Sequence, residues 1–430
     1  MRYQILNTLL HLLAFYVGAG IGSFLNVVIY RLPLEGKSVN NPKRSFCPTC
    51  GYQIPMWQNI PLLSWLLLRG KCANCKSRIS IRYFLVELLT GVLFYMIFLK
   101  VSGDYAMGGD PWPKIKEWGP HVLCLWIFVS LLISGTFIDI DHFILPHSIT
   151  IGGAGVGLLA SFWVPALVGE TEHLRGFLIS LASAALGLGL LWIIVELGKL
   201  AFGKVHHRQK PGYLKSASPS ICWLVGKFMG CEWLDKSVKW SVDQVKDDEP
   251  PVVSFANKKM EWGDIYGRES DRMVITCDEL QVNDRSWKNV TAEMWHDKLR
   301  VNSNDSSEEF QLEGVTTLHG IVSEVVIPRE AMGFGDVLFL MMIGSFCGWQ
   351  SVLFTIFAAS MIGTLFAMVP RLLGKAEWSA KIPFGPYLAL GATIWVFCGP
   401  QIVEWYVSKT MWRQSQHSHT LDVSSAEVSG

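Results

Sequence analysis

The chain has 430 residues, of which 50% are hydrophobic and only 17% are charged, and it contains 18 Trp and 23 Phe. This composition is typical of a membrane protein and argues against a soluble enzyme. The formal net charge of +1 decides nothing by itself about binding partners. We therefore expect the chain to lie in a lipid bilayer. We do not expect it to bind nucleic acid.

The apolar segments predict an all-α polytopic membrane protein with about eight transmembrane helices, because stretches of about 17 to 25 predominantly apolar residues can cross a bilayer. The predicted spans lie near residues 5–30, 84–101, 121–140, 148–168, 176–202, 334–348, 350–370 and 384–407. The segment 334–348 is short for a span, so a re-entrant or tilted segment is an alternative there. The first span continues to about Tyr30 without a cleavage site, which favours a retained anchor over a signal peptide.

Pairs of glycines four residues apart occur within two of these spans. Gly18 with Gly22 and Gly153 with Gly157 form small-x-x-x-small patterns. Such pairs let helix backbones approach closely. We expect tight helix packing at both.

The connection after the first span is basic, since residues 31–82 hold nine Lys or Arg and a single acid, Glu35. Basic connecting loops stay in the cytoplasm. We therefore predict that this loop is cytoplasmic and that both termini lie outside.

A polar region interrupts the membrane segments, and its alternating runs, such as Met273-Val274-Ile275-Thr276, predict a soluble, partly β insert, cytoplasmic under the same topology. The Ser- and His-rich tail predicts disorder. The predicted organisation is a first transmembrane helix at 1–30, a small cytoplasmic tetra-cysteine domain at 31–83, transmembrane helices 2–5 at 84–202, the insert at 203–328, transmembrane helices 6–8 at 329–410 and a disordered tail at 411–430.

Four of the ten cysteines have the spacing of a metal site: Cys47-Pro48-Thr49-Cys50 and Cys72-Ala73-Asn74-Cys75. Two C-x2-C knuckles match tetrathiolate zinc ligation, and four thiolates close the coordination shell, so a structural zinc is favoured over a catalytic one. Two disulfides, redox chemistry and unrelated free thiols are the alternatives, although a reducing cytoplasm argues against disulfides. The other six cysteines show no ligand spacing and are interpreted as buried small hydrophobic residues: Cys124, Cys222, Cys231, Cys277, Cys347 and Cys398.

Two aspartates, Asp139 and Asp336, lie at the edges of apolar runs. A carboxylate near a membrane interior costs about 2.5 kcal/mol or more, so a functional role is the default interpretation. Two carboxyls brought together in a low dielectric cannot both ionise easily and can share one proton, which is the chemistry of an aspartic protease. Asp141 would face about 200° away from Asp139 on a helix. It is therefore interpreted as secondary, a solvated acid at the helix end.

Eight segments, in order, identify a family. They are Gly22-Ser23-Phe24-Leu25-Asn26-Val27-Val28-Ile29-Tyr30-Arg31-Leu32-Pro33; Cys47-Pro48-x-Cys50-Gly51; Asn59-Ile60-Pro61-Leu62-Leu63-Ser64-Trp65; Gly70-Lys71-Cys72-x-x-Cys75; Ile81-Arg82-Tyr83 with Glu87; Ile138-Asp139-x-Asp141-His142 with Leu145-Pro146; Glu330-Ala331-Met332-Gly333-Phe334-Gly335-Asp336; and Pro383-Phe384-Gly385-Pro386. The chain resembles the bacterial type IV prepilin peptidases, GxGD-type membrane aspartic proteases. The resemblance leaves out only the insert and the tail.

The resemblance implies that Asp139 and Asp336 are the catalytic pair, supported by Gly333, Gly335 and Asp141. It implies cleavage of the leaders of type IV prepilins and type II secretion pseudopilins at the cytoplasmic face of the plasma (inner) membrane. It also implies N-methylation of the new N-terminus with S-adenosylmethionine. No methyl-donor residue is assigned, because Glu35 and Glu87 are equally compatible with structural roles.

Two features differ from the family pattern, namely His147 after Leu-Pro and Val337 after the GxGD aspartate. Neither touches the proposed pair, and His142 and His147 are interpreted as boundary residues rather than metal ligands. Other classes of function remain open at this point. Intramembrane aspartates also build ion pathways, so a transporter is one alternative, and a non-enzymatic assembly scaffold is another.

Overall fold

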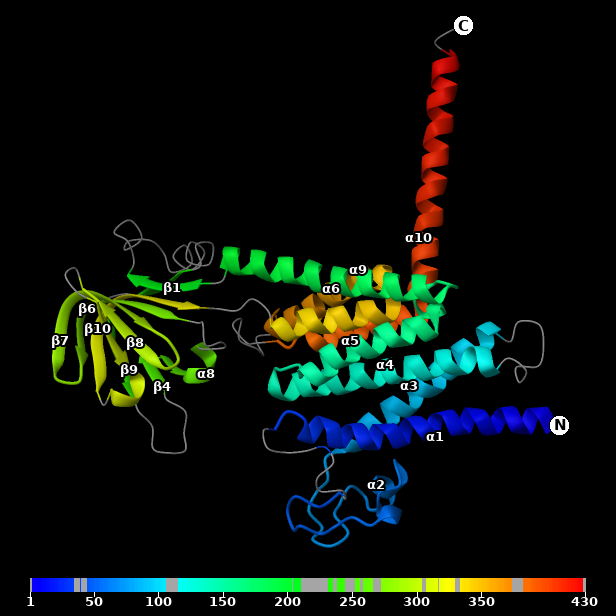
Figure 1. Ribbon diagram of the computed structural model, residues 1–430, viewed down its shortest axis with the longest axis horizontal. Coiled ribbons are helices and arrows are strands. Elements are labelled where there is room, and N and C mark those ends of the chain that lie inside the picture. The colour runs from blue at the N-terminus through cyan, green and yellow to red at the C-terminus, as the bar shows by residue number, and fades with distance from the viewer. Residues whose placement is uncertain are drawn as a thin grey trace. The chain divides into compact units, whose positions relative to one another are not determined.

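The structure of the chain is a computed structural model, shown in Figure 1. It describes residues 2–34, 39, 45–105, 115–202, 204–209, 231–234, 238–243, 252–255, 258–265, 272–303, 307–315, 317–328, 333–372 and 382–427. The chain divides into two compact units, Met1–Trp192 together with Gly333–Gly430, and Ile193–Met332. Glu35 and Cys222 lie outside the described residues.

Long apolar helices dominate the first unit (Figure 1), and α6 continues from it into the second. The helices are α1 (Arg2–Arg31), α3 (Ile81–Tyr105), α4 (Ile115–His142), α5 (His147–Trp163), α6 (His173–Phe202), α9 (Phe334–Leu372) and α10 (Gly385–Glu427). Within the described residues, six stretches are long and apolar enough to cross a membrane: Thr8–Arg31, Ile81–Gly103, Trp118–His142, His173–Gly198, Phe334–Val369 and Gly385–Lys409. The predicted helical, multi-pass membrane architecture is confirmed.

The predicted number of about eight spans is not confirmed. The span expected at 148–168 corresponds to α5, which has 17 residues, and the spans expected at 334–348 and 350–370 are joined in α9. A straight helix of the 39 residues of α9 would be about 58 Å long, roughly twice the hydrocarbon core of a bilayer. The helix is interrupted at Gly348, whose dihedrals (φ 80°, ψ 174°) are not helical. The two spans expected at 334–348 and 350–370 therefore correspond to the two helical parts of α9, which lie on either side of the break at Gly348.

Glycines bring α1 and α3 into close contact, as the small-x-x-x-small pattern predicts. A methyl group on Gly18 would lie 2.8 Å from the backbone of Gly91, and one on Gly22 would lie 2.7 Å from Cα of Glu87. Gly157 is equally crowded by Ser345 and Phe346 of α9. The predicted tight packing is confirmed, since any larger side chain would separate these helices.

Polar groups connect the helices at two places where the regular backbone pattern is broken. Pro400 lies inside α10 and has no N–H to donate to the carbonyl four residues earlier. The ammonium of Lys100 on α3 donates to that carbonyl, the oxygen of Val396, at 2.7 Å. Near the kink at Gly348, the carbonyl oxygen of Ser345 accepts hydrogen bonds from the hydroxyls of Ser161 and Ser180.

The tetra-cysteine domain, defined here as residues 45–80, contains little regular structure. It has a short 3₁₀ helix η1 (Met56–Gln58) and one turn of helix, α2 (Leu63–Leu67). Two isolated bridges, Phe46 with Gln53 and Lys71 with Arg78, close a tight loop around each C-x2-C pair. So small a segment buries little apolar surface, which fits a fold held by a metal.

The second unit contains a ten-stranded sheet, so the predicted partly β insert is confirmed. Its strands are β1 (Lys204–Gln209), β2 (Cys231–Leu234), β3 (Val238–Asp243), β4 (Val252–Phe255), β5 (Lys258–Glu261), β6 (Met273–Val282), β7 (Arg285–Met294), β8 (Lys298–Asn302), β9 (Ser307–Gln311) and β10 (Leu318–Pro328); two short helical segments are α8 (Trp262–Ile265) and η5 (Leu312–Gly314). The order is β5-β4-β3-β10-β6-β7-β8-β9, and β1 pairs with β10 and β2.

The alternating residues that predict strands do form the core of this sheet. Met273 and Ile275 of β6 are fully buried, and their neighbours Val274 and Thr276 are only partly buried. A two-residue turn at Asn283 and Asp284 joins β6 to β7, and Asn283 adopts φ 52°, a conformation that asparagine tolerates.

The cysteines outside the tetra-cysteine domain are only partly as predicted. Cys277 and Cys347 are buried, Cys124 is intermediate, and Cys398 is exposed on α10, so the interpretation of all six as buried residues is wrong for Cys398. Burial of the Cys277 thiol in the sheet raises its pKa to about 12, as expected for an inert core residue.

The C-terminal tail also differs from expectation, because α10 continues to Glu427 where disorder was predicted from 411. The composition of the tail disfavours a new helix. Here no new helix has to be nucleated, since the tail extends an existing one.

Candidate active site

The two aspartates singled out in the sequence lie on α4 and α9, and both are buried. Asp139 is 5% exposed and Asp336 is 7% exposed. Asp139 belongs to the last turn of α4, and Asp336 to the first turn of α9, where its backbone N–H donates to the carbonyl of Gly333. Among the described residues no cation forms an ion pair with either carboxyl group, and burial of ionisable groups without one is costly, so their placement calls for a functional explanation.

The start of α10 contacts Asp139 directly. The N–H of Gly385 donates to Oδ2 of Asp139 at 3.0 Å. This N–H is one of the groups that a helix leaves unpaired at its N-terminus, where the helix dipole also favours negative charge. A methyl group on Gly385 would lie 2.7 Å from the same oxygen, so the contact requires glycine.

Leu145, in the short connection between α4 and α5, packs between the elements that carry both aspartates. A methyl group on Gly335 would lie 2.9 Å from Cβ of Leu145, and one on Gly385 would lie 3.4 Å from its Cδ1. Gly335 directly precedes Asp336, and Gly385 binds Asp139. Leu145 therefore fixes the spacing of the helix ends that bear the two carboxyls.

The two carboxyl groups interact electrostatically with each other. Oδ1 of Asp336 is buried and has no hydrogen-bond partner among the described residues. Buried polar atoms without a hydrogen-bond partner are rare in protein interiors, and they are typical of sites that receive a ligand or a water. The structure thus brings together two aspartates that nearly half of the chain separates in the sequence.

Asp141 has a different environment from Asp139, although it lies only two residues further. Nη1 of Arg82, at the start of α3, donates to both of its carboxylate oxygens, at 2.7 and 2.5 Å. The same guanidinium stacks over the ring of Phe137 at 5.0 Å and donates to the Phe137 carbonyl at 3.4 Å. Asp141 thus anchors the end of α4 to α3, a role the sequence did not reveal.

The four cysteines of the tetra-cysteine domain form a group that could hold a metal ion, as their Sγ atoms all lie within 4.8 Å of one another. The two halves have matching turns: Cys47 O accepts from Gly51 N, and Cys72 O accepts from Lys76 N. Gly51 and Lys76 both adopt positive φ, at 70° and 59°. Lys76 is strained there, since only glycine and a few polar residues adopt this conformation readily.

The domain favours the thiolate form at Cys47 and Cys75, whereas burial and the neighbouring cysteines raise the pKa of Cys50. Backbone N–H groups of Cys50 and Thr49 hold the pKa of the Cys47 thiol down to about 6. Hydrogen bonds from Ser77 lower the pKa of Cys75. Thiolates are the form in which cysteine binds metals.

The remaining sequence candidates are less involved. His142 and His147 are exposed, and in the described part of the chain only the four cysteines form a candidate metal group. Gly333 has room for a side chain, with only Oδ2 of Asp336 at 3.7 Å from a methyl group placed there. The residue that sequence reasoning missed is Gly385. The Pro-Phe-Gly-Pro run at the start of an apolar helix could have indicated it, because the free N–H groups at a helix N-terminus favour a carboxylate partner.

Sequence profiles of two protein families match this chain in the regions that build these sites. The profile of the bacterial peptidase A24 N-terminal domain matches residues 16–101, and that of the type IV leader peptidase family matches residues 126–206 and 306–368. A protein of Neisseria gonorrhoeae named prepilin leader peptidase/N-methyltransferase is 38% identical over 218 residues, which is 45% of this chain and 67% of that protein. The chain belongs to the type IV leader peptidase family.

Further relatives carry similar names. A prepilin leader peptidase/N-methyltransferase of Aeromonas hydrophila is 26% identical over 420 residues, covering 92% of this chain and 93% of that protein. A type 4 prepilin-like proteins leader peptide-processing enzyme of Escherichia coli O78:H11 is 34% identical over 211 residues, which is 42% of this chain and 73% of that protein. No solved structure matches the chain. The family profile resumes only at residue 306, so most of the sheet of the second unit is an insertion in the peptidase domain.

Proposed function

We propose that this protein is a membrane aspartic endopeptidase that removes the leader of type IV prepilins and type II secretion pseudopilins, and that it also methylates the new N-terminus. The observation that carries the peptidase activity is the meeting of two buried carboxyls, Asp139 and Asp336, at the start of α10. Membership of the type IV leader peptidase family and the names of the relatives support the same activity.

In the proposed mechanism Asp139 is the general base and Asp336 the general acid. The Gly385 N–H and the N-terminus of α10 stabilise a negative charge on Asp139. That carboxylate takes a proton from a water as the water attacks the scissile carbonyl. Asp336, protonated and with Oδ1 unpartnered among the described residues, donates to the carbonyl oxygen. In the tetrahedral intermediate that results, the carbon–nitrogen bond breaks as Asp139 gives the proton it took to the leaving amine nitrogen, and Asp336 takes back a proton from the hydroxyl as the carboxyl product forms. No covalent enzyme intermediate is formed.

The site also supports a membrane orientation. The pair of Arg82 and Asp141 links the end of α4 that carries Asp139 to the start of α3, which directly follows the basic tetra-cysteine domain. We propose that this end faces the cytoplasm and that the membrane is the plasma (inner) membrane, because the tetra-cysteine domain carries the excess of Lys and Arg. Cleavage would then occur where the pilin helix enters the bilayer.

The test of this function uses the purified full chain in detergent and a synthetic prepilin segment with its leader. Mass spectrometry is expected to show two products, the free leader and the mature segment, and a mass increase of one methyl group when S-adenosylmethionine is added. Intact substrate after prolonged incubation would contradict the peptidase. A transporter would instead show ion flux that depends on Asp139, and a scaffold would bind the substrate without cutting it.

We further propose that the tetra-cysteine domain binds a structural zinc ion. Four thiolates at a Zn–S distance of about 2.3 Å lie about 3.8 Å apart in a tetrahedron. The Sγ atoms of Cys47 and Cys75 are 3.8 Å apart, and the other separations stay within 4.8 Å. The cysteines thus already have nearly the geometry that tetrahedral zinc requires, and a closed set of four ligands leaves no position for a catalytic water.

Elemental analysis is expected to find about one zinc ion per chain, because four preorganised thiolates bind zinc tightly. Cys50→Ser is expected to lose the metal and to make residues 45–80 sensitive to limited proteolysis. Cys398→Ser, which replaces an exposed cysteine outside the group, is the matched control and should keep the metal. A zinc-free wild-type chain with a protease-resistant domain would rule out the structural ion.

A further inference from the structure

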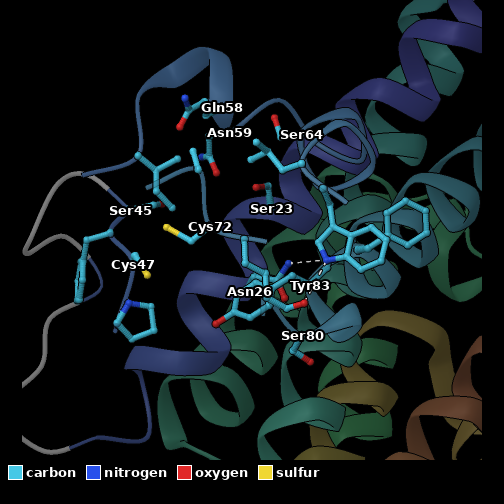
Figure 2. A pocket seen from close by; sticks show the side chains of 18 of the residues that line it. Ser23, Asn26, Ser45, Cys47, Gln58, Asn59, Ser64, Cys72, Ser80 and Tyr83 are labelled. Carbon is cyan, nitrogen blue, oxygen red and sulfur yellow. Dashed lines mark hydrogen bonds between the residues drawn. The ribbon is translucent and has the colours of Figure 1, made fainter. Parts of the chain in front are cut away.

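A cavity of about 400 Å³ lies between the tetra-cysteine domain and the adjoining ends of α1 and α3. Figure 2 shows Ser23, Asn26 and Tyr83 on the side formed by these helices, and Gln58 and Asn59 on the side formed by the tetra-cysteine domain. Cavities of about 300 to 1,000 Å³ hold ligands of the size of a nucleoside derivative. The peptidase mechanism uses none of these residues, so the cavity needs an explanation of its own.

The lining combines aromatic rings with a few polar groups that converge on the cavity. The rings of Trp65 and Phe84 pack with centroids 5.3 Å apart, and the exposed face of Tyr83 adds a third ring. Asn26 is 7% exposed and donates its amide to the carbonyl of Tyr83 at 3.1 Å. Aromatic faces attract cations and stack on purine rings. The charged side chains of the lining are Glu87, Arg31 and Arg78, so the cavity suits a ligand that carries an aromatic base together with groups of both charges.

Glu87 is the carboxylate of this cavity, and the surrounding backbone holds it in place. Its Oε2 accepts the N–H of Leu62 at 2.7 Å. Leu62 has φ 64° and ψ −51°, a strained conformation for leucine, and strained residues held in this way gather at functional sites. On the other side, the close approach of Gly22 to Cα of Glu87 fixes this part of α3 against α1.

We propose that this cavity is the methyl-transfer site, that it binds S-adenosylmethionine and the freed amine of the cleaved pilin, and that Glu87 is the proton acceptor. This inference rests on the proposed function for its substrate. The cavity offers the Glu87 carboxylate and aromatic rings to the sulfonium cation of the donor, and the guanidinium groups of Arg31 and Arg78 to its carboxylate. The amine nitrogen forms a bond to the methyl carbon, and the carbon–sulfur bond breaks with its electron pair left on sulfur. Glu87 accepts the proton that the amine gives up, and S-adenosylhomocysteine is the second product.

The position of the cavity relative to the peptidase site supports the order of the two reactions. Tyr83 lines the cavity, and its neighbour Arg82 binds Asp141 and Phe137 at the end of α4 that carries Asp139. The product of the first reaction is the substrate of the second. The pair of Arg82 and Asp141 joins the cavity to the peptidase site at the same end of the helices. The new N-terminus can therefore pass from one site to the other without crossing the bilayer.

The test compares variants of the full chain in detergent by three measurements: binding of tritiated S-adenosylmethionine, methylation of the mature peptide and cleavage of the leader. Asn59→Trp places a large ring in the cavity from an exposed loop. Met56→Trp is its matched control, because Met56 lies on the same loop, is 87% exposed and does not line the cavity. Glu87→Gln removes the charge but keeps an oxygen that can accept the Leu62 N–H.

Asn59→Trp is expected to weaken donor binding by about tenfold or more, since the added ring occupies space in the cavity that the donor needs. Met56→Trp should bind as the wild type does. Glu87→Gln is expected to bind the donor and to slow methylation by about 10²- to 10⁴-fold, the usual contribution of a general base. Leader cleavage should stay within about twofold of the wild type in all three variants, because none of them alters the aspartate site.

Normal donor binding by Asn59→Trp, or wild-type methylation by Glu87→Gln, would overturn the assignment of this cavity. A wild-type chain that cleaves the leader but binds no donor would overturn it as well. A wild-type chain that does not cleave the leader would instead refute the proposed function, so the two failures are distinguishable.

Discussion

Asp139→Asn and Asp336→Asn are each expected to reduce leader cleavage by at least about a thousandfold. Each aspartate is proposed to transfer a proton in the rate-determining step, and such groups contribute about 10²- to 10⁴-fold apiece. An asparagine at either position cannot exchange the proton that the pair shares. The measurement is the rate of leader release under single-turnover conditions, followed by mass spectrometry.

The variants should fold, and the structure gives the reason. An asparagine at 139 keeps an oxygen that can accept the Gly385 N–H, and an asparagine at 336 no longer buries an ionisable group. Equal thermal unfolding in detergent would establish this. Glu172→Gln is the matched control, since its carboxylate is 66% exposed in the connection before α6. Normal cleavage by either aspartate variant would remove the proposed pair from the mechanism.

Gly385→Ala and Gly335→Ala should each reduce cleavage by about a hundredfold, whereas Gly333→Ala should have a small effect. At Gly385 the added methyl would lie 2.7 Å from Oδ2 of Asp139, and at Gly335 it would lie 2.9 Å from Cβ of Leu145. Each clash is relieved only by moving a helix end that carries an active-site group, and a displacement of about 1 Å can cost about 10²-fold in rate. At Gly333 the nearest atom is an ordinary 3.7 Å away.

This comparison separates two explanations of the glycines in the GxGD motif. If both glycines serve to let the substrate strand approach the backbone, alanine at either position should be equally harmful. If packing on Leu145 is the reason, only Gly335 should be sensitive. Steady-state kinetics with one substrate distinguishes the two, and a loss at Gly333 as large as that at Gly335 would contradict the packing explanation.

The methyl-transfer assignment gives a role to the tetra-cysteine domain without placing chemistry on the metal. In this arrangement the zinc would hold the loop that carries Leu62 and Trp65, and this loop positions Glu87 and part of the cavity wall. The insert contributes to neither site through any described contact. Its position between the two segments matched by the family profile indicates that it is a separate unit inserted into the sequence of the peptidase domain.

The sequence by itself determined the features that depend on local composition. The apolar spans, the alternating strands of the insert, the two C-x2-C knuckles and the two aspartates in apolar surroundings could all be recognised because each reflects the cost of placing a residue type in water or in lipid. The helix contacts at Gly18 and Gly22 were likewise predictable from their spacing.

Only the tertiary structure decided how these parts combine. Hydropathy divides the chain near Gly348 but cannot give the non-helical dihedrals with which this residue breaks α9, nor the 17-residue length of α5. The contact of Gly385 with Asp139 and the pairing of Arg82 with Asp141 join segments that are 246 and 59 residues apart. Hydrogen bonds and close packing depend on distances of a few tenths of an ångström between such segments, and the pattern of residues along one segment carries no information about them.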